Sequence, residues 1–110
     1  MQAKTLGKII IATPGAPVQV SALSGIAGEC ARIRFEAVMG NTNATFVGIA
    51  GLVGSTLANC IKQLAKPTAG APPDYFELDS EDNTNILNIS DYYVDAATAG
   101  EGVLVTFWQR

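Results

Sequence analysis

The chain of 110 residues is 48% hydrophobic, which provides enough apolar side chains for the core of one domain and too few for two. Charged residues make up only 15% and the net charge is -3, with the basic residues scattered along the chain, so a direct nucleic-acid interface is not expected. Histidine is absent, which excludes Ser-His-Asp and Cys-His nucleophile systems and the usual zinc sites.

The N-terminal segment, residues 1–6, is expected to project as an arm ahead of the first strand. Gly7–Thr13 contains three consecutive isoleucines and predicts a strand, which the run Pro14–Pro17 ends with a turn. Residues 18–20 alternate and predict a short second strand. We expect no signal peptide, because Gln2, Lys4 and Lys8 interrupt any apolar run before residue nine. We expect no membrane span, because the longest apolar stretch, Phe46–Ala58, has 13 residues against the roughly 20 that a spanning helix needs.

The clearest alternation in the sequence is Arg32–Met39. Its apolar residues, Ile33, Phe35, Ala37 and Met39, share one face of a strand, and its charged residues, Arg32, Arg34 and Glu36, share the other. The run Gly40–Asn43 has the composition of a turn, and Thr45–Ile49 resumes a strand pattern beyond it. These three stretches together predict a hairpin.

The middle of the chain gives a weaker pattern. Gly51–Ala58 is predicted to be a loop, because Gly51, Gly54 and Ser55 weaken both helix and strand. Asn59–Ala65 predicts a strand with Cys60 and Leu64 on one side and Ile61 and Gln63 on the other. Residues 67–73, rich in proline, predict a long connection.

The last third of the chain is again rich in strand signals. Tyr75–Asp79 alternates with Phe76 and Leu78 inward, residues 80–85 form a polar turn, and residues 86–95 contain further strand. In Val103–Trp108, the residues Val103, Val105 and Phe107 form one face and Leu104, Thr106 and Trp108 the other. About eight short strands without a long helix predict an all-β fold, a single β-sandwich or jelly-roll-like domain spanning residues 1–110.

Catalytic chemistry is not expected. A glycosidase needs two acids facing a cleft, and the only candidates are the turn-proximal carboxylates Glu77, Asp79, Asp91 and Asp95. The run Asp79–Asn83 lacks the residue order of a calcium-binding EF-hand loop and is interpreted as an acidic turn. Cys30 and Cys60 have no metal or redox spacing and are interpreted as reduced residues. Neither a cofactor nor a metal is therefore expected.

Four stretches of the sequence are familiar in combination: GKIIIATPGAPV (7–18), TFVG (45–48), ISDYYVDA (89–96) and GEGVLV (100–105). They resemble small virion-associated structural proteins of tailed bacteriophages. The resemblance implies a β-sandwich decoration or cement subunit that is made in the host cytoplasm and sits on the capsid surface. It also implies a homo-oligomer, a trimer or dimer, that stabilises the lattice of the major capsid protein.

Under this hypothesis the partner contacts come from the segments least suited to a core, together with an outward aromatic residue near the C-terminus. The expected contact residues are Met1, Gln2, Lys4, Leu6, Leu52, Val53, Leu57 and Trp108. No membrane contact is expected. Two other functions stay open: a tail, fibre or collar component, and a carbohydrate-binding module that uses exposed aromatic residues on one sheet face.

Overall fold

The computed structural model describes residues 2–20, 29–79 and 87–109, which form nine strands and a short 3-10 helix. In chain order these elements are β1 (Gln2–Ile10), β2 (Val18–Gln19), β3 (Glu29–Ala37), β4 (Thr45–Val53), β5 (Ala58–Leu64), β6 (Tyr75–Asp79), β7 (Leu87–Asn88), η1 (Ile89–Asp91), β8 (Tyr93–Ala96) and β9 (Gly102–Gln109).

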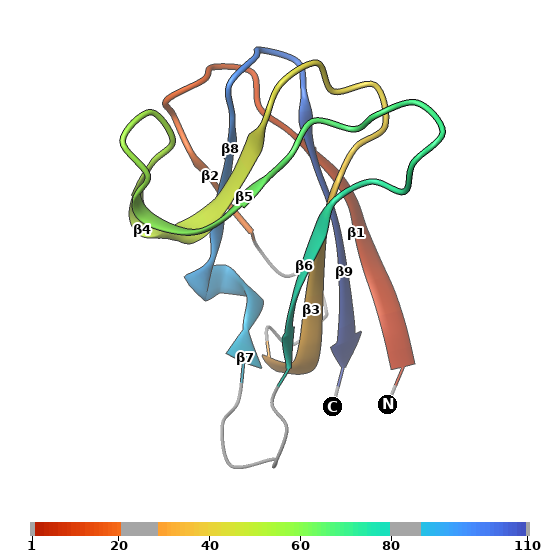
Figure 1. Cartoon of the computed structure of the whole chain (residues 1–110). Coiled ribbons are helices and arrows are strands. Elements are labelled where there is room, and N and C mark those ends of the chain that lie inside the picture. The colour runs from red at the N-terminus through yellow and green to blue at the C-terminus, as the bar shows by residue number, and fades with distance from the viewer. Residues whose placement is uncertain (1, 21–28, 80–86, 110) are drawn as a thin grey trace.

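The strands form two antiparallel sheets that pack face to face (Figure 1). One sheet has the order β1-β9-β3-β6, with β7 also paired to β3, and the other has the order β2-β8-β4-β5. The pairs β4–β5, β3–β6, β2–β8 and β1–β9 are nested, as in one long hairpin rolled up so that β9 also reaches β3 and β8 also reaches β4. This is the strand order of a jelly roll, and the predicted fold class is confirmed.

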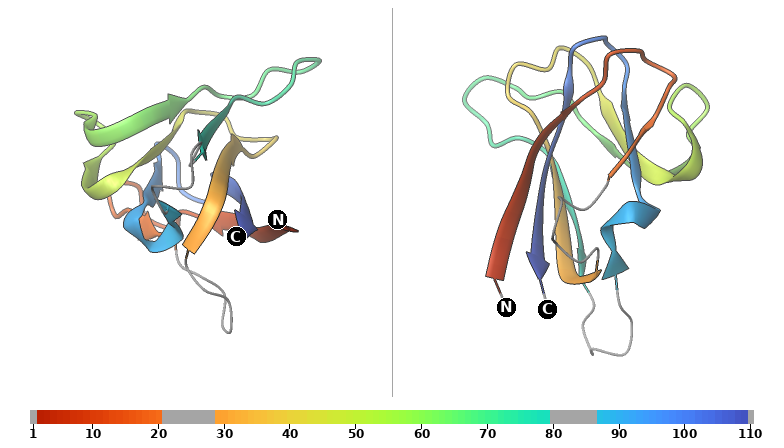
Figure 2. Two further views of the ribbon diagram at one scale, coloured as in Figure 1. Left: turned by 90° about the horizontal axis from the view of Figure 1, so that it is seen from below. Right: turned by 180° about the vertical axis from the view of Figure 1, so that it is seen from behind.

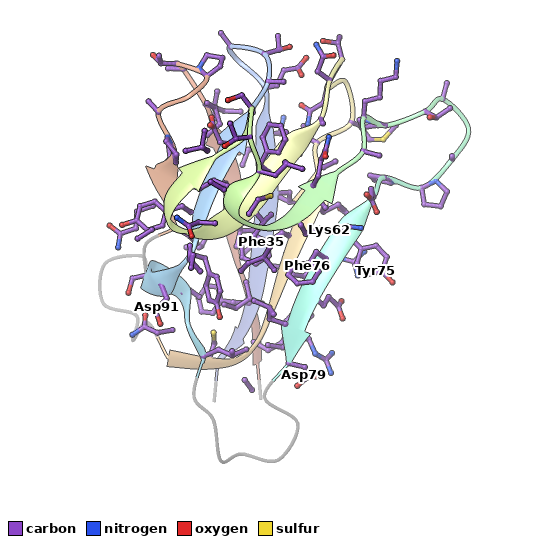
Figure 3. The ribbon with its side chains drawn as sticks, turned by 60° about the vertical axis from the view of Figure 1, so that its left-hand side comes forward. Phe35, Lys62, Tyr75, Phe76, Asp79 and Asp91 are labelled. Atoms are coloured by element: carbon purple, nitrogen blue, oxygen red, sulfur yellow. The ribbon has the colours of Figure 1, made fainter. Side chains whose placement is uncertain are left out.

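The core lies between the two sheets and follows the predicted alternation. Ile33, Phe35 and Ala37 of β3 are buried, and Val103, Val105 and Phe107 of β9 are buried beside them, with Val47 and Val94 of the other sheet in the same cluster. Figure 3 shows Phe35 and Phe76 between the sheets, whereas Tyr75, the neighbour of Phe76 in β6, points away from the core. Met39 does not share the buried face as predicted, because β3 ends at Ala37 and Met39 is exposed.

The predicted hairpin of residues 32–49 is wrong. β3 pairs with β9 and β6 in one sheet, whereas β4 pairs with β8 and β5 in the other, so residues 38–44 cross between the sheets. The side chain of Asn41 anchors this crossing, because its Nδ2 donates to the Gly102 carbonyl at 2.9 Å. The turn residues predicted a reversal correctly, but they carried no information about which strand lies beside β3.

The expected N-terminal arm is not free. Gln2 to Leu6 belong to β1, and the backbone register along β9 begins with Gln2 opposite Gln109. The physical reason is that β9, paired on its other side with β3, would otherwise leave a row of unpaired backbone groups. The two ends of the chain therefore lie side by side (Figures 1 and 2).

Candidate contact site

The β4–β5 hairpin carries half of the exposed large apolar side chains that the structure describes. These four residues, called here the hairpin patch, are Ile49, Val53, Leu57 and Ile61, with exposed fractions of 42–47%. The other exposed large apolar side chains are spread over separate places in the fold: Ile10, Val18, Met39 and Tyr75. A concentration of exposed apolar groups on one hairpin is typical of a surface that meets a partner.

Leu57, in the turn of this hairpin, has an unusual backbone conformation. Its φ is 61°, in the left-handed region, and Asn59 two residues later has a φ of 54°. Asparagine tolerates this region, but for leucine it costs roughly 1–2 kcal/mol, because Cβ approaches the following carbonyl oxygen. Leu57 is therefore a large apolar side chain held in a strained conformation and exposed to solvent.

The hairpin curls because two glycines allow close approach within it. A Cβ at Gly48 would meet the Asn59 carbonyl oxygen and would lie 2.8 Å from Leu52 Cδ1. A Cβ at Gly54 would lie 2.7 Å from the Phe46 ring. The β4–β5 register is interrupted on both sides of Gly48, which adds to the bend.

The prediction that residues 51–58 form a loop is therefore only partly right. β4 extends to Val53 and β5 begins at Ala58, so the turn itself is residues 54–57. Glycine lowers strand propensity, but here the bulges and close contacts use glycine within the strand, so tertiary pairing overrides propensity. The same curl buries Leu52, which is 3% exposed and is therefore not the surface residue that the sequence predicted.

A cavity of about 340 Å³ lies beside the hairpin turn. Val53 and Ser55 of the hairpin line one side, Pro14 and Gly15 of the β1–β2 connection line another, and Phe46 and Asp95 contribute from β4 and β8. Phe46 and Asp95 are directly paired across the β4–β8 ladder and so lie on the same face of the sheet. The cavity is thus continuous with the hairpin patch through Val53.

Asp95 is buried, with an exposed fraction of 1%. Its Oδ1 accepts hydrogen bonds from the Ala96 N–H at 2.8 Å and the Gly15 N–H at 3.3 Å, and its Oδ2 accepts from the Gly15 N–H at 3.2 Å. Among the described residues, no lysine or arginine forms an ion pair with this carboxylate. Buried carboxylates are ordinarily paired with a cation, so this environment is unusual.

The outer face of the other sheet carries charges that neutralise one another. Arg32 pairs with Asp79 at 3.0 Å and Arg34 pairs with Glu77 at 3.0 Å, and these pairs lie directly across the β3–β6 ladder. Arg32 also stacks over Trp108, with its guanidinium carbon 5.3 Å from the ring centre.

Arg34 stacks in the same way over Tyr75, with its guanidinium carbon 4.0 Å from the ring centre. The two aromatic side chains described on this face, Trp108 and Tyr75, each have a guanidinium over the ring, so they do not form the bare aromatic platform expected of a carbohydrate-binding module.

The predicted contact residues fall into two groups. Val53 and Leu57 come together on the hairpin, where Leu52 is buried beneath them. Gln2, Lys4 and Leu6 lie in β1 and Trp108 in the neighbouring β9, at the other side of the molecule (Figure 1), and Leu6 packs partly against the core. Met1 lies outside the described residues. Sequence reasoning missed Ile49, which lies in a strand pattern, and it placed Ile61 on the side of its strand opposite Cys60 and Leu64 without assigning it a contact role.

The carboxylates that were candidates for catalysis are divided among β6, η1 and β8. Glu77 and Asp79 pair with arginines on one sheet, Asp95 lies on the other, and Figure 3 shows Asp91 far from Asp79. No cluster of three metal-ligating side chains occurs within residues 2–20, 29–79 and 87–109. Most of the acidic turn at residues 79–83 lies outside the described residues.

Cys30 and Cys60 are both free thiols, with Cys30 buried and Cys60 half-buried. None of the helices described is long and apolar enough to cross a membrane. Comparison with family models, curated proteins and solved structures found no match.

Proposed function

We propose that this chain is a structural contact protein of a virus particle, a decoration or cement subunit that stabilises the lattice of a major capsid protein. The observation that carries the proposal is Leu57, which is exposed and strained in the turn of the hairpin. A glycine at this position would adopt the same backbone without strain. A leucine at this exposed and strained position is explained by a partner that buries its side chain.

The size of the hairpin patch favours a contact that is repeated many times. Burying the exposed half of each of the four side chains contributes about 1 kcal/mol, or about 4 kcal/mol in all. Association of two proteins costs at least that much in lost translational and rotational freedom. One patch therefore gives weak binding, and an array of copies on a symmetric lattice supplies the affinity through multiplicity.

The fold and the surface charge agree with this role. The jelly roll is an architecture that viral capsid domains use, although a fold alone does not fix a function. The arginines of the outer β3–β6 face are paired with carboxylates, which leaves this face without a strong field for a nucleic acid. The resemblance of the sequence to phage virion proteins supports the same partner class.

The location of the chain is tested by quantitative mass spectrometry of purified particles. Hundreds of copies per particle are expected for a shell subunit. A dozen or fewer copies would place it in the tail, fibre or collar, and complete absence from particles would overturn the proposal.

The contact itself is tested by binding purified chain to particles that lack it. We expect Leu57→Gly and Ile61→Ser each to weaken binding about fivefold per contact, which corresponds to the loss of about 1 kcal/mol of buried apolar surface. Ile10→Ser is the matched control, because Ile10 has a similar exposed fraction, 48% against 42% for Ile61, but lies in β1. Equal binding by the hairpin variants and the control would contradict the assignment of the contact to the hairpin.

A further inference from the structure

We propose that the cavity beside the hairpin turn is an anchor site for an arginine side chain of the partner protein. The inference rests on the proposed contact function and deepens it, because the cavity adjoins the hairpin patch through Val53. Its volume of about 340 Å³ lies in the lower range of ligand pockets and suits one large side chain. Partner side chains that fill such pockets beside an apolar contact are the usual energetic centres of protein interfaces, and arginine is among the commonest of them.

The chemistry of the lining selects a cation. Asp95 has two oxygens with about four acceptor positions, and the described residues fill them only with the N–H groups of Gly15 and Ala96. A carboxylate buried without a cation is unfavourable, and a guanidinium supplies both the positive charge and the missing donors. The binding of the partner therefore completes an ion pair that the chain alone leaves unmade.

The rest of the lining selects a long side chain with an apolar stem and a flat end. Phe46 provides an aromatic ring, over which a guanidinium stacks favourably, and Pro14 and Val53 provide apolar walls for the methylene groups. Arginine matches this combination better than lysine, because its planar group both stacks on a ring and donates two hydrogen bonds to one carboxylate.

Entry of the guanidinium requires a small outward shift of the turn at Pro14–Gly15. This turn contacts Asp95 through the single Gly15 N–H, which is shared between the two carboxylate oxygens at long distances of 3.3 and 3.2 Å. Both turn residues are solvent-exposed. The turn therefore gives way with little loss, and the stronger bonds of the guanidinium replace the weak ones.

The test is an NMR titration of the full chain with N-acetylargininamide, with the neutral isostere N-acetylcitrullinamide as the matched ligand. We expect saturable shifts of the Gly15, Gly54 and Ala97 amide signals with the arginine compound and at least tenfold weaker binding of citrulline. Asp95→Asn is expected to remove this preference. Equal binding of both compounds, shifts spread over the whole surface, or an unchanged preference in Asp95→Asn would overturn the anchor site.

A second variant keeps the test decisive if Asp95→Asn fails to fold. Ser55 is exposed at the rim of the cavity, so Ser55→Phe is expected to fill its mouth and abolish binding of the arginine compound while Asp95 stays in place. Undiminished binding by Ser55→Phe would contradict the location. Particle binding that depends on Leu57 but occurs without any arginine preference would remove the anchor site alone, whereas absence from particles would remove only the proposed function.

Discussion

The side chain of Asn41 provides the sharpest test of how the two sheets are joined. It is 7% exposed, its Nδ2 donates to the Gly102 carbonyl at 2.9 Å, and its Oδ1 accepts from the Gly102 N–H at 3.4 Å. Gly102 lies one residue before the last β3–β9 pair, Ala37 with Val103. The side-chain amide of Asn41 therefore bonds to the backbone N–H and carbonyl of Gly102, just beyond the point where the pairing of β3 with β9 ends.

Replacement of Asn41 by alanine leaves both backbone groups of Gly102 without these partners. A buried polar group without a partner costs about 1–3 kcal/mol, and the longer of the two bonds counts for less, so the expected loss of unfolding free energy is about 2–4 kcal/mol. At this chain length each kcal/mol lowers Tm by about 4 °C. Asn41→Ala is therefore expected to lower Tm by about 8–16 °C.

The assay is thermal and urea unfolding followed by circular dichroism, and the chain offers a matched control two residues away. Asn43 is exposed, and its side-chain Nδ2 donates to Thr98 Oγ1 at 2.7 Å, a bond that water replaces. The backbone N–H of Asn43 that donates to Glu101 is kept in Asn43→Ala, so this variant is expected to change stability by less than about 0.5 kcal/mol. Equal stability of the two variants would refute the reasoning, because both residues have the same chemistry and differ in burial and partner.

Three further predictions concern titration, thiol reactivity and the sheet edge. Burial alone would raise the pKa of Glu101, but hydrogen bonds from Thr42 and from the Asn43 N–H lower it below its usual value near 4.5. The stabilisation by this carboxylate is therefore present above about pH 4.5 and is lost as the pH falls through the lowered pKa of Glu101. Glu101→Gln is expected to flatten the dependence of Tm on pH in that range, and an unchanged profile of Tm against pH would contradict this. Burial raises the pKa of Cys30 to about 11 and also raises the pKa of the less buried Cys60. A thiol reagent at neutral pH is expected to label Cys60 before Cys30, as followed by mass spectrometry. Equal labelling rates would count against the burial of Cys30. Lys62 lies in β5, at the edge of its sheet, opposite the buried Val47 of β4, and it extends toward β6 (Figure 3). Lys62→Val is therefore expected to promote concentration-dependent association in analytical ultracentrifugation. A variant that stays at the wild-type mass at all concentrations would show that this charge does not protect the edge.

Much of the fold was predictable from local patterns. The alternation in residues 32–37 and 103–108 identified the buried faces of β3 and β9, because side chains on a strand point alternately to opposite sides. The same patterns did not predict the nested pairing of the jelly roll or the place of residues 2–6 beside β9. Pairing between strands far apart in sequence depends on the whole set of strands, and a local pattern of two-residue period is compatible with many partners.

The candidate site was predictable only in part. The weak pattern around Gly51–Ala58 correctly marked Val53 and Leu57 as exposed, since the segment fits neither a helix nor a regular strand. It also included Leu52, which the curl of the hairpin buries. No sequence signal placed Pro14 and Asp95 at one cavity, because they come from opposite ends of the chain.

The sequence by itself determined the secondary-structure class, the inward faces of the long strands and the absence of histidine chemistry, because these follow from composition and from the two-residue period of a strand. The tertiary structure alone decided which strands are neighbours, which of two similar asparagines is buried, and that Val53 of the hairpin patch lines the same cavity as Asp95. These depend on contacts between residues distant in sequence, which local chemistry leaves open.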